Sequence, residues 1–150
     1  QVCVVVAHDR NGQILSEVAG KGRITALEID TVLGDYLDNS ALPCTDTATN
    51  YKKFAAMKGL KHEVINARKK EYVRQNIYHI QHVNSYHRRL KDWMLRFNGV
   101  ATKYLNGYLI WHRFLEINKK FPSKENVNEM LLNACKKANF TTVIDIRNIS

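Results

Sequence analysis

The chain has 150 residues, of which 45% are apolar and 25% are charged. These values are typical of one compact domain, and they exclude a disordered, collagen-like or fibrous protein. No stretch approaches the roughly 20 apolar residues of a membrane-spanning helix. We expect no secretory leader, because Gln1 begins directly in an apolar run. The few, widely spaced cysteines, Cys3, Cys44 and Cys135, argue against a disulfide framework or a zinc ribbon and favour a reducing compartment.

The charge is distributed unevenly along the chain. The net charge is +9, yet residues 1–50 contain three Lys and Arg against seven Asp and Glu, whereas residues 51–150 contain twenty against seven. Within residues 51–104, thirteen basic side chains accompany three acidic ones. Such a concentration of positive charge favours a polyanionic partner such as nucleic acid. A basic surface that only keeps the protein soluble is the alternative interpretation.

The first elements predicted are the two strands of a hairpin. The β-branched run Gln1–His8 indicates a strand buried on both faces. The Asn-Gly pair that ends residues 9–12 is typical of a hairpin turn, so Gln13–Ala19 should return beside the first strand. Asp9 opens this turn, and we expect its carboxylate to bond within the turn instead of taking part in catalysis.

A helix, a strand and a second helix follow the hairpin. Thr25–Glu28 fits a capping box, which predicts the start of a helix over about residues 25–38. The apolar segment Ser40–Thr45 predicts a short strand, and its proline indicates an edge or early strand position. Ala48–Lys58 predicts the second helix, which Gly59 should end.

The rest of the chain is predicted to be mainly helical. His62–Asn66 indicates another short strand, and the basic segment 67–75 indicates a loop or a frayed helical turn. Apolar residues recur at helical spacing over three further segments: about 80–97, 101–118 and 123–137. Residues 141–147 fit a strand or an ordered tail equally well. A hairpin followed by alternating strands and helices predicts an α/β domain with a mixed sheet.

Asp46 is the first candidate for chemistry. It comes directly after the predicted strand Ser40–Thr45 and just before the helix that begins at Ala48. The carboxyl ends of strands border the ligand crevice in α/β sheets, and a carboxylate there can bind Mg²⁺. The competing interpretation is that Asp46 only caps the helix that follows it.

Asn84 lies near the start of the long helix and shares a face with two basic residues. Arg88 and Lys91 follow at i+4 and i+7, and seven residues at 100° each return to within about 20° of the starting direction. Apolar residues occupy the opposite side: Val83, Tyr86, Leu90 and Trp93. The helix therefore offers an amide, a guanidinium and an ammonium on one face, although a merely solvated polar face is the alternative interpretation.

Three histidines, His79, His82 and His87, cluster around the start of this helix. No Cys or carboxylate completes a zinc signature with them, so we expect a structural or DNA-facing role for these side chains. The sequence also contains no phosphate-cradling Gly loop, no G-x-S-x-G motif and no cysteine in a nucleophile context.

The segment Tyr78–Leu90 (YHIQHVNSYHRRL) and its continuation to Glu116 resemble the end of the catalytic domain of bacterial insertion-sequence transposases of the ISXO-like family. Phe97–Leu105 (FNGVATKYL) is the most specific part. Upstream, CTDTATNYKKFA resembles the family's C-x-D-x-x-x-x-Y segment, and VVVAHDRNG resembles its early strand-turn-strand. The resemblance spans about residues 2–118. We therefore expect residues 1–118 to form a partial catalytic domain and residues 119–150 a C-terminal helix and tail.

The resemblance implies a ribonuclease-H-like (retroviral-integrase-like) fold, in which helices flank a mixed sheet, with a DDE-type active site. Such sites hold two Mg²⁺ or Mn²⁺ ions between an Asp on the first strand, an Asp after the fourth strand and a third group on a late helix. Asp46 matches the second ligand, Asn84 matches the third, and Lys91 matches a basic residue two turns further on. No residue matches the first Asp, so we expect it on a strand before Gln1. We also expect the 150-residue chain not to be a competent nuclease by itself.

The function that the resemblance implies is metal-dependent DNA cleavage and strand transfer at insertion-sequence ends. DNA backbone contacts are expected from Arg88, Arg89, Lys91, Arg96 and Lys103. The expected partners are transposon-end DNA and target DNA, with no membrane, and the full-length protein is expected to be a homo-oligomer in the cytoplasm, at the nucleoid. Two alternatives stay open: a non-enzymatic, degraded transposase remnant, and a basic module that binds RNA or DNA.

Overall fold

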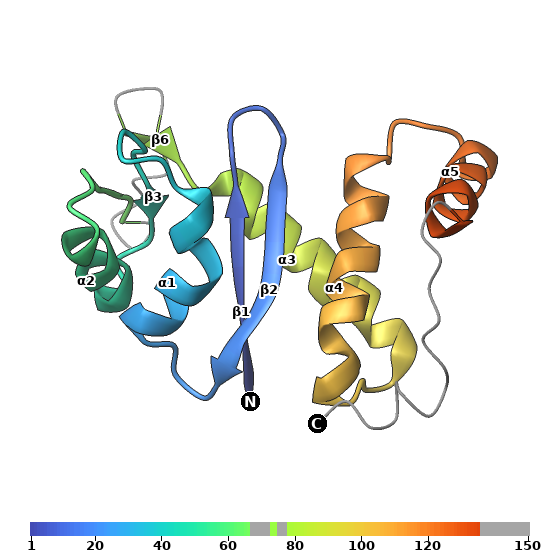
Figure 1. Ribbon diagram of the computed structural model, residues 1–150, viewed down its shortest axis with the longest axis horizontal. Coiled ribbons are helices and arrows are strands. Elements are labelled where there is room, and N and C mark those ends of the chain that lie inside the picture. The colour runs from blue at the N-terminus through green and yellow to red at the C-terminus, as the bar shows by residue number, and fades with distance from the viewer. Residues whose placement is uncertain (67–72, 75–77, 136–150) are drawn as a thin grey trace. The chain divides into compact units, whose positions relative to one another are not determined.

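The computed structural model describes residues 1–66, 73–74 and 78–135. The chain forms two compact units, Gln1–Gly99 and Val100–Ser150 (Figure 1). Helices and strands alternate in the first unit, which confirms the α/β class. The described strands pair in three separate two-stranded sheets instead of the single mixed sheet expected. The expected boundary at residue 118 between a catalytic domain and its tail stays a prediction.

The predicted hairpin is present at the start of the chain. β1 (Val2–His8) pairs antiparallel with β2 (Ile14–Lys21). In the exposed turn between them, the Asp9 carboxylate accepts a hydrogen bond from the Gln13 N–H at 2.7 Å. Gly12 adopts a φ of 88°, a conformation that glycine reaches without a steric penalty. These contacts confirm that Asp9 stabilises the turn.

The two faces of the hairpin are covered by different helices. On one face, α1 (Ala26–Leu33) and α2 (Thr49–Met57) complete an apolar core with the hairpin: Val5, Ile29, Val32, Leu33 and Phe54. On the other face lies α3 (Gln81–Met94), which crosses behind the hairpin in Figure 1. Most of β1 is only half-buried, so the prediction of a strand buried on both faces is wrong outside its centre.

The helix α1 begins at the predicted capping box. The Thr25 hydroxyl accepts the Glu28 N–H at 3.2 Å, and the Glu28 carboxylate accepts the Thr25 N–H at 2.7 Å. The helix ends at Leu33 and continues as a 3₁₀ turn, η1 (Gly34–Tyr36), so it is shorter than the predicted 25–38.

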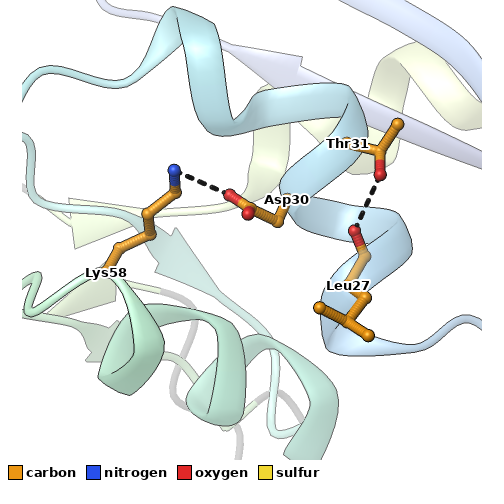
Figure 2. A network of polar contacts seen from close by, with 4 residues as sticks. All are labelled: Leu27, Asp30, Thr31 and Lys58. Atoms are coloured by element: carbon orange, nitrogen blue, oxygen red, sulfur yellow. Dashed lines mark hydrogen bonds and ion pairs between the residues drawn. The ribbon is translucent and has the colours of Figure 1, made fainter.

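An ion pair joins α1 to the end of α2. Lys58 Nζ lies 2.8 Å from Asp30 Oδ1, and Figure 2 shows the lysine reaching across to the helix. The Thr31 hydroxyl on the same helix donates to the Leu27 carbonyl at 3.0 Å. Both charged side chains are about one-third exposed (36% and 33%), so the pair contributes at most about 1 kcal/mol. Burial of Phe54, worth about 1.5–3 kcal/mol, therefore matters more for holding the two helices together.

The first of two short paired strands ends directly before the candidate site residue Asp46. β3 (Cys44–Thr45) pairs in parallel with β4 (Glu63–Val64), and the Ile65 N–H donates to the Thr45 carbonyl at 2.8 Å. Both strands are shorter than their predicted segments, 40–45 and 62–66.

A second short pair lies next to β3. β5 (Val73–Arg74) and β6 (Tyr78–His79) pair antiparallel, where a loop or a frayed helical turn was predicted for 67–75. β6 contacts β3 and leads directly into α3. The rest of the predicted loop, 67–72 and residue 75, lies outside the described residues.

The long helices end close to their predicted limits. α3 continues as a 3₁₀ turn, η3 (Leu95–Phe97), and the chain then turns through Asn98 and Gly99, whose φ angles are 50° and 112°. The second unit contains α4 (Thr102–Ile117) and α5 (Ser123–Cys135). Residues 136–137 of the last predicted helix, and the segment 141–147, lie outside the described residues.

All three cysteines are free thiols, as expected. Among the helices of the described part of the chain, none is long and apolar enough to cross a membrane.

Candidate active site

Asp46 lies immediately after β3, at its carboxyl end, and is exposed to solvent. Its Oδ1 atom accepts a hydrogen bond from the Ala48 N–H at 3.0 Å. Ala48 is the N-cap of α2 and makes no side-chain capping bond itself. Asp46 therefore helps to start α2, as the competing interpretation required, and it also presents a carboxylate at a strand end.

Thr45, the residue before Asp46, bonds to His62, which precedes β4. The Thr45 hydroxyl donates to the Asp46 carbonyl at 3.0 Å and lies 2.7 Å from His62 Nε2. Because this hydroxyl has one proton, the imidazole must donate through its Nε2–H. Burial and the nearby Lys52 lower the pKa of His62, which favours the neutral imidazole. The sequence did not reveal this contact.

Tyr51, on the first turns of α2, lies close to Asp46. Burial first, and then the negative charge of Asp46, raise the pKa of the Tyr51 phenol, so it stays protonated at neutral pH. The same side chain packs against the apolar core of the first unit. Tyr51 therefore connects the position of the Asp46 loop to the core.

The polar face predicted for α3 is present. Asn84, Arg88 and Lys91 are all exposed, whereas Tyr86 and Leu90 on the other side are buried. Asn84 lies in the first turn, where its N–H donates to the Ile80 carbonyl at 3.0 Å. The first turn contains no acidic residue and Ile80 makes no side-chain cap, so the positive end of the helix dipole favours an anion there.

His87 lies between the polar face and the buried face of α3 and is half-buried. Burial first, and then the positive charge of Lys91 one turn away, lower its pKa. The imidazole is therefore neutral at physiological pH. No group of three or more His, Cys, Asp and Glu side chains that could hold a metal ion occurs in the part of the chain that the structure describes.

The other predicted DNA contacts differ in their surroundings. The Arg89 guanidinium donates to the Ser85 hydroxyl at 2.5 Å, one turn earlier on α3, and is half-buried. Arg96 is exposed in η3. Lys103 belongs to the second unit, where its ammonium lies 5.2 Å from the centre of the Tyr104 ring.

Two contacts attach α3 to the hairpin, and the sequence predicted neither. The His82 ring stacks on His8, at the end of β1, with ring centres 5.3 Å apart and planes inclined by 19°. One turn later the buried Tyr86 hydroxyl donates to the buried Ser16 hydroxyl of β2 at 3.0 Å. Together they place the first turn of α3 at the carboxyl end of β1.

Short elements connect the segment that contains Asp46 to the helix that contains Asn84. Asp46 follows β3, β3 contacts β6, and β6 ends two residues before α3 begins. Asn84 then lies in the first turn of that helix. Convergence of the two side chains on shared metal ions stays a prediction.

The model of one family, the ISXO2-like transposase domain, matches residues 1–114. The chain belongs to the ISXO2-like transposase domain family. This match confirms the resemblance noted for the segments around Asp46 and Asn84, and it gives the chain a role in transposition. No curated protein and no solved structure matches the chain.

The donor atoms of this transposase domain fit the divalent ions that such families use. Asp46 offers a carboxylate and Asn84 an amide oxygen, and Mg²⁺ prefers oxygen ligands of this kind. One carboxylate carries a single negative charge, which is little for two divalent ions. The two residues therefore fit as part of a ligand set.

Proposed function

We propose that this transposase domain cleaves DNA at insertion-sequence ends and joins those ends to target DNA, in a ribonuclease-H-like site with two divalent ions. The placement of Asp46 and Asn84 supports this proposal most directly. Asp46 follows β3, and Asn84 lies in the first turn of α3, the helix that follows the adjacent β6. Ligand sites of α/β sheets lie at such strand ends.

Each residue has a distinct role in this proposal. The Asp46 carboxylate and the Asn84 amide oxygen would hold the metal ions, Mg²⁺ or Mn²⁺. When bound, such ions polarise the scissile phosphate and lower the pKa of an attacking water. The Lys91 ammonium, two turns after Asn84, would bind a phosphate oxygen and hold the strand in place. Asn84 is neutral, so we expect weaker metal affinity than with a carboxylate at this position.

The polar face of α3 is the proposed DNA contact. Arg88 and Lys91 are exposed there, the helix N-terminus adds positive potential, and η3 adds the exposed Arg96. Arg89, and separately Lys103 in the second unit, are also proposed to contact the DNA backbone. Such contacts fix the position of DNA without reading its sequence.

We propose further that the full-length protein acts as a homo-oligomer in the cytoplasm, at the nucleoid. Strand transfer joins two ends of one element to a target, and two subunits can present two active sites to those ends. The partners are the element ends and the target DNA.

Cleavage by a matched pair of aspartate variants tests the proposal. The full-length protein is incubated with Mn²⁺ and a plasmid that carries the ends of its own element. Asp46→Asn should abolish cleavage, because it removes the charge but keeps an acceptor for the Ala48 N–H. Asp9→Asn, the matched control in the exposed turn, should leave cleavage unchanged.

Three other outcomes would count against the proposal. Cleavage that survives Asp46→Asn would show that the chemistry lies elsewhere. Loss of cleavage in Asp9→Asn would show that the turn aspartate supplies a ligand. No cleavage by the unchanged protein, together with intact DNA binding, would favour the non-enzymatic alternative.

A further inference from the structure

A buried pair of hydroxyl groups joins α3 to the hairpin. Tyr86 is 0% exposed and Ser16 is 1% exposed, and the tyrosine hydroxyl donates to the serine hydroxyl at 3.0 Å. The two residues are 70 positions apart in the sequence. Burying hydroxyl groups is costly unless they are hydrogen-bonded, so this contact strongly favours one arrangement of helix and strand.

The position of Tyr86 on α3 determines where the polar face points. Asn84 precedes Tyr86 by two residues and Lys91 follows it by five. At 100° per residue, Asn84 lies about 160° and Lys91 about 140° around the helix from Tyr86, measured in the same direction. When Tyr86 points at the hairpin, Asn84 and Lys91 therefore point away from it. The stacking of His82 on His8, one turn earlier, gives the helix a second fixed point on the same strand pair.

Apolar packing alone would not fix this rotation closely. The hydrophobic contribution of Leu90 has no directional preference, whereas a hydrogen bond weakens steeply when its donor turns away. A rotation of α3 by about 20° would move a side chain some 5 Å from the helix axis by about 2 Å. A misplacement of about 1 Å can cost about 100-fold in catalysis.

We propose that Ser16 and Tyr86 are positioning residues, whose hydrogen bond sets the rotation of α3 and so presents Asn84 and Lys91 to the metal ions and the DNA. This inference rests on the function proposed above. In this proposal neither hydroxyl contacts DNA or metal. Each acts through the orientation of the helix.

The test compares Tyr86→Phe and Ser16→Ala with two controls in the full-length protein. Tyr36→Phe removes a hydroxyl from an exposed tyrosine of η1. Ile29→Val removes one methylene from the core on the opposite face of the hairpin and so lowers stability without touching α3. Three quantities are measured for each variant: the melting temperature, the Mn²⁺ concentration that gives half-maximal cleavage of the element-end plasmid, and Mn²⁺ affinity in the absence of DNA.

Both hydroxyl variants should raise the Mn²⁺ requirement and weaken Mn²⁺ binding roughly tenfold, as changes to groups that orient metal ligands do. The double variant should be no worse than either single one, because both remove the same bond. Ile29→Val should lower the melting temperature by a similar amount and leave both metal measurements unchanged, and Tyr36→Phe should change nothing.

The proposal is overturned if Tyr86→Phe and Ser16→Ala behave like Ile29→Val, with lower stability and unchanged metal affinity. Asp46→Asn in the same series separates this failure from failure of the proposed function. If Asp46→Asn abolishes cleavage while Tyr86→Phe keeps the normal Mn²⁺ requirement, only the positioning role is wrong. If Asp46→Asn still cleaves, or the unchanged protein binds no Mn²⁺, the function itself is wrong and the positioning role is wrong with it.

Discussion

Removing two positive charges from the polar face of α3 should change how the protein responds to salt. Arg88 and Lys91 are both exposed, and they lie on adjacent turns of one helix face. If each neutralises one DNA phosphate, the double variant Arg88→Ala/Lys91→Ala releases fewer counterions on binding. Its affinity should then depend less on salt than that of the unchanged protein.

The size of this effect follows from the number of contacts. Each neutralised phosphate adds about 0.9 to the slope of log K against log salt, so losing two lowers the slope by about 1.8. Between about 50 and about 200 mM salt, the ratio of the DNA affinity of the unchanged protein to that of the double variant should therefore shrink roughly twelvefold.

Fluorescence anisotropy with a labelled random-sequence duplex measures these slopes. The matched control is Lys53→Ala/Lys61→Ala, which removes the same charge from exposed positions on α2 and the loop after it. The control should keep nearly the full slope. An equal fall in slope for both double variants would refute the reasoning, because only overall charge, and no particular face, would then be involved.

Three further changes should have distinct effects. Asn84→Asp adds a negative charge to the proposed ligand set and should lower the Mn²⁺ concentration for half-maximal cleavage; an unchanged or higher requirement would speak against Asn84 as a ligand. Burial and Lys91 lower the pKa of His87 in the folded protein. The contribution of neutral His87 to the free energy of unfolding is therefore fully present above about pH 6.5 and is lost as the pH falls through the lower folded-state pKa. The melting temperature of His87→Gln should accordingly fall less between about pH 7 and about pH 5 than that of the unchanged protein. An equal fall would contradict this linkage. Thr25→Ala should cost about 1 kcal/mol in urea denaturation by removing the cap of α1, whereas the exposed Thr31→Ala should cost less; equal costs would contradict the capping argument.

Features that depend on neighbouring residues could be predicted from the sequence. The turn at Asp9 and the cap at Thr25 form between residues three or four positions apart, so their patterns predict them directly. The exposed and buried sides of α3 follow from helical spacing for the same reason. The family could also be recognised, because its motifs are continuous segments.

Contacts between distant residues could not be predicted in this way. The Ser16–Tyr86 bond joins residues 70 positions apart, and the Thr45–His62 contact joins residues 17 apart. A single polar residue in a strand pattern does not indicate which residue it will bond to. The short lengths of β3 and β4 depend likewise on which backbone groups find partners. The way the described strands divide into three sheets also depends on pairing that no local pattern specifies.

The most direct test of the central claim is to locate the metal ions. Crystals of the full-length protein soaked in Mn²⁺ would show the ions in an anomalous-difference map. We predict a peak about 2.1 Å from an Asp46 carboxylate oxygen, with the Asn84 amide oxygen among the ligands of the same pair of ions. Peaks bound elsewhere, or an Asn84 side chain on the opposite side of the domain from Asp46, would contradict the account.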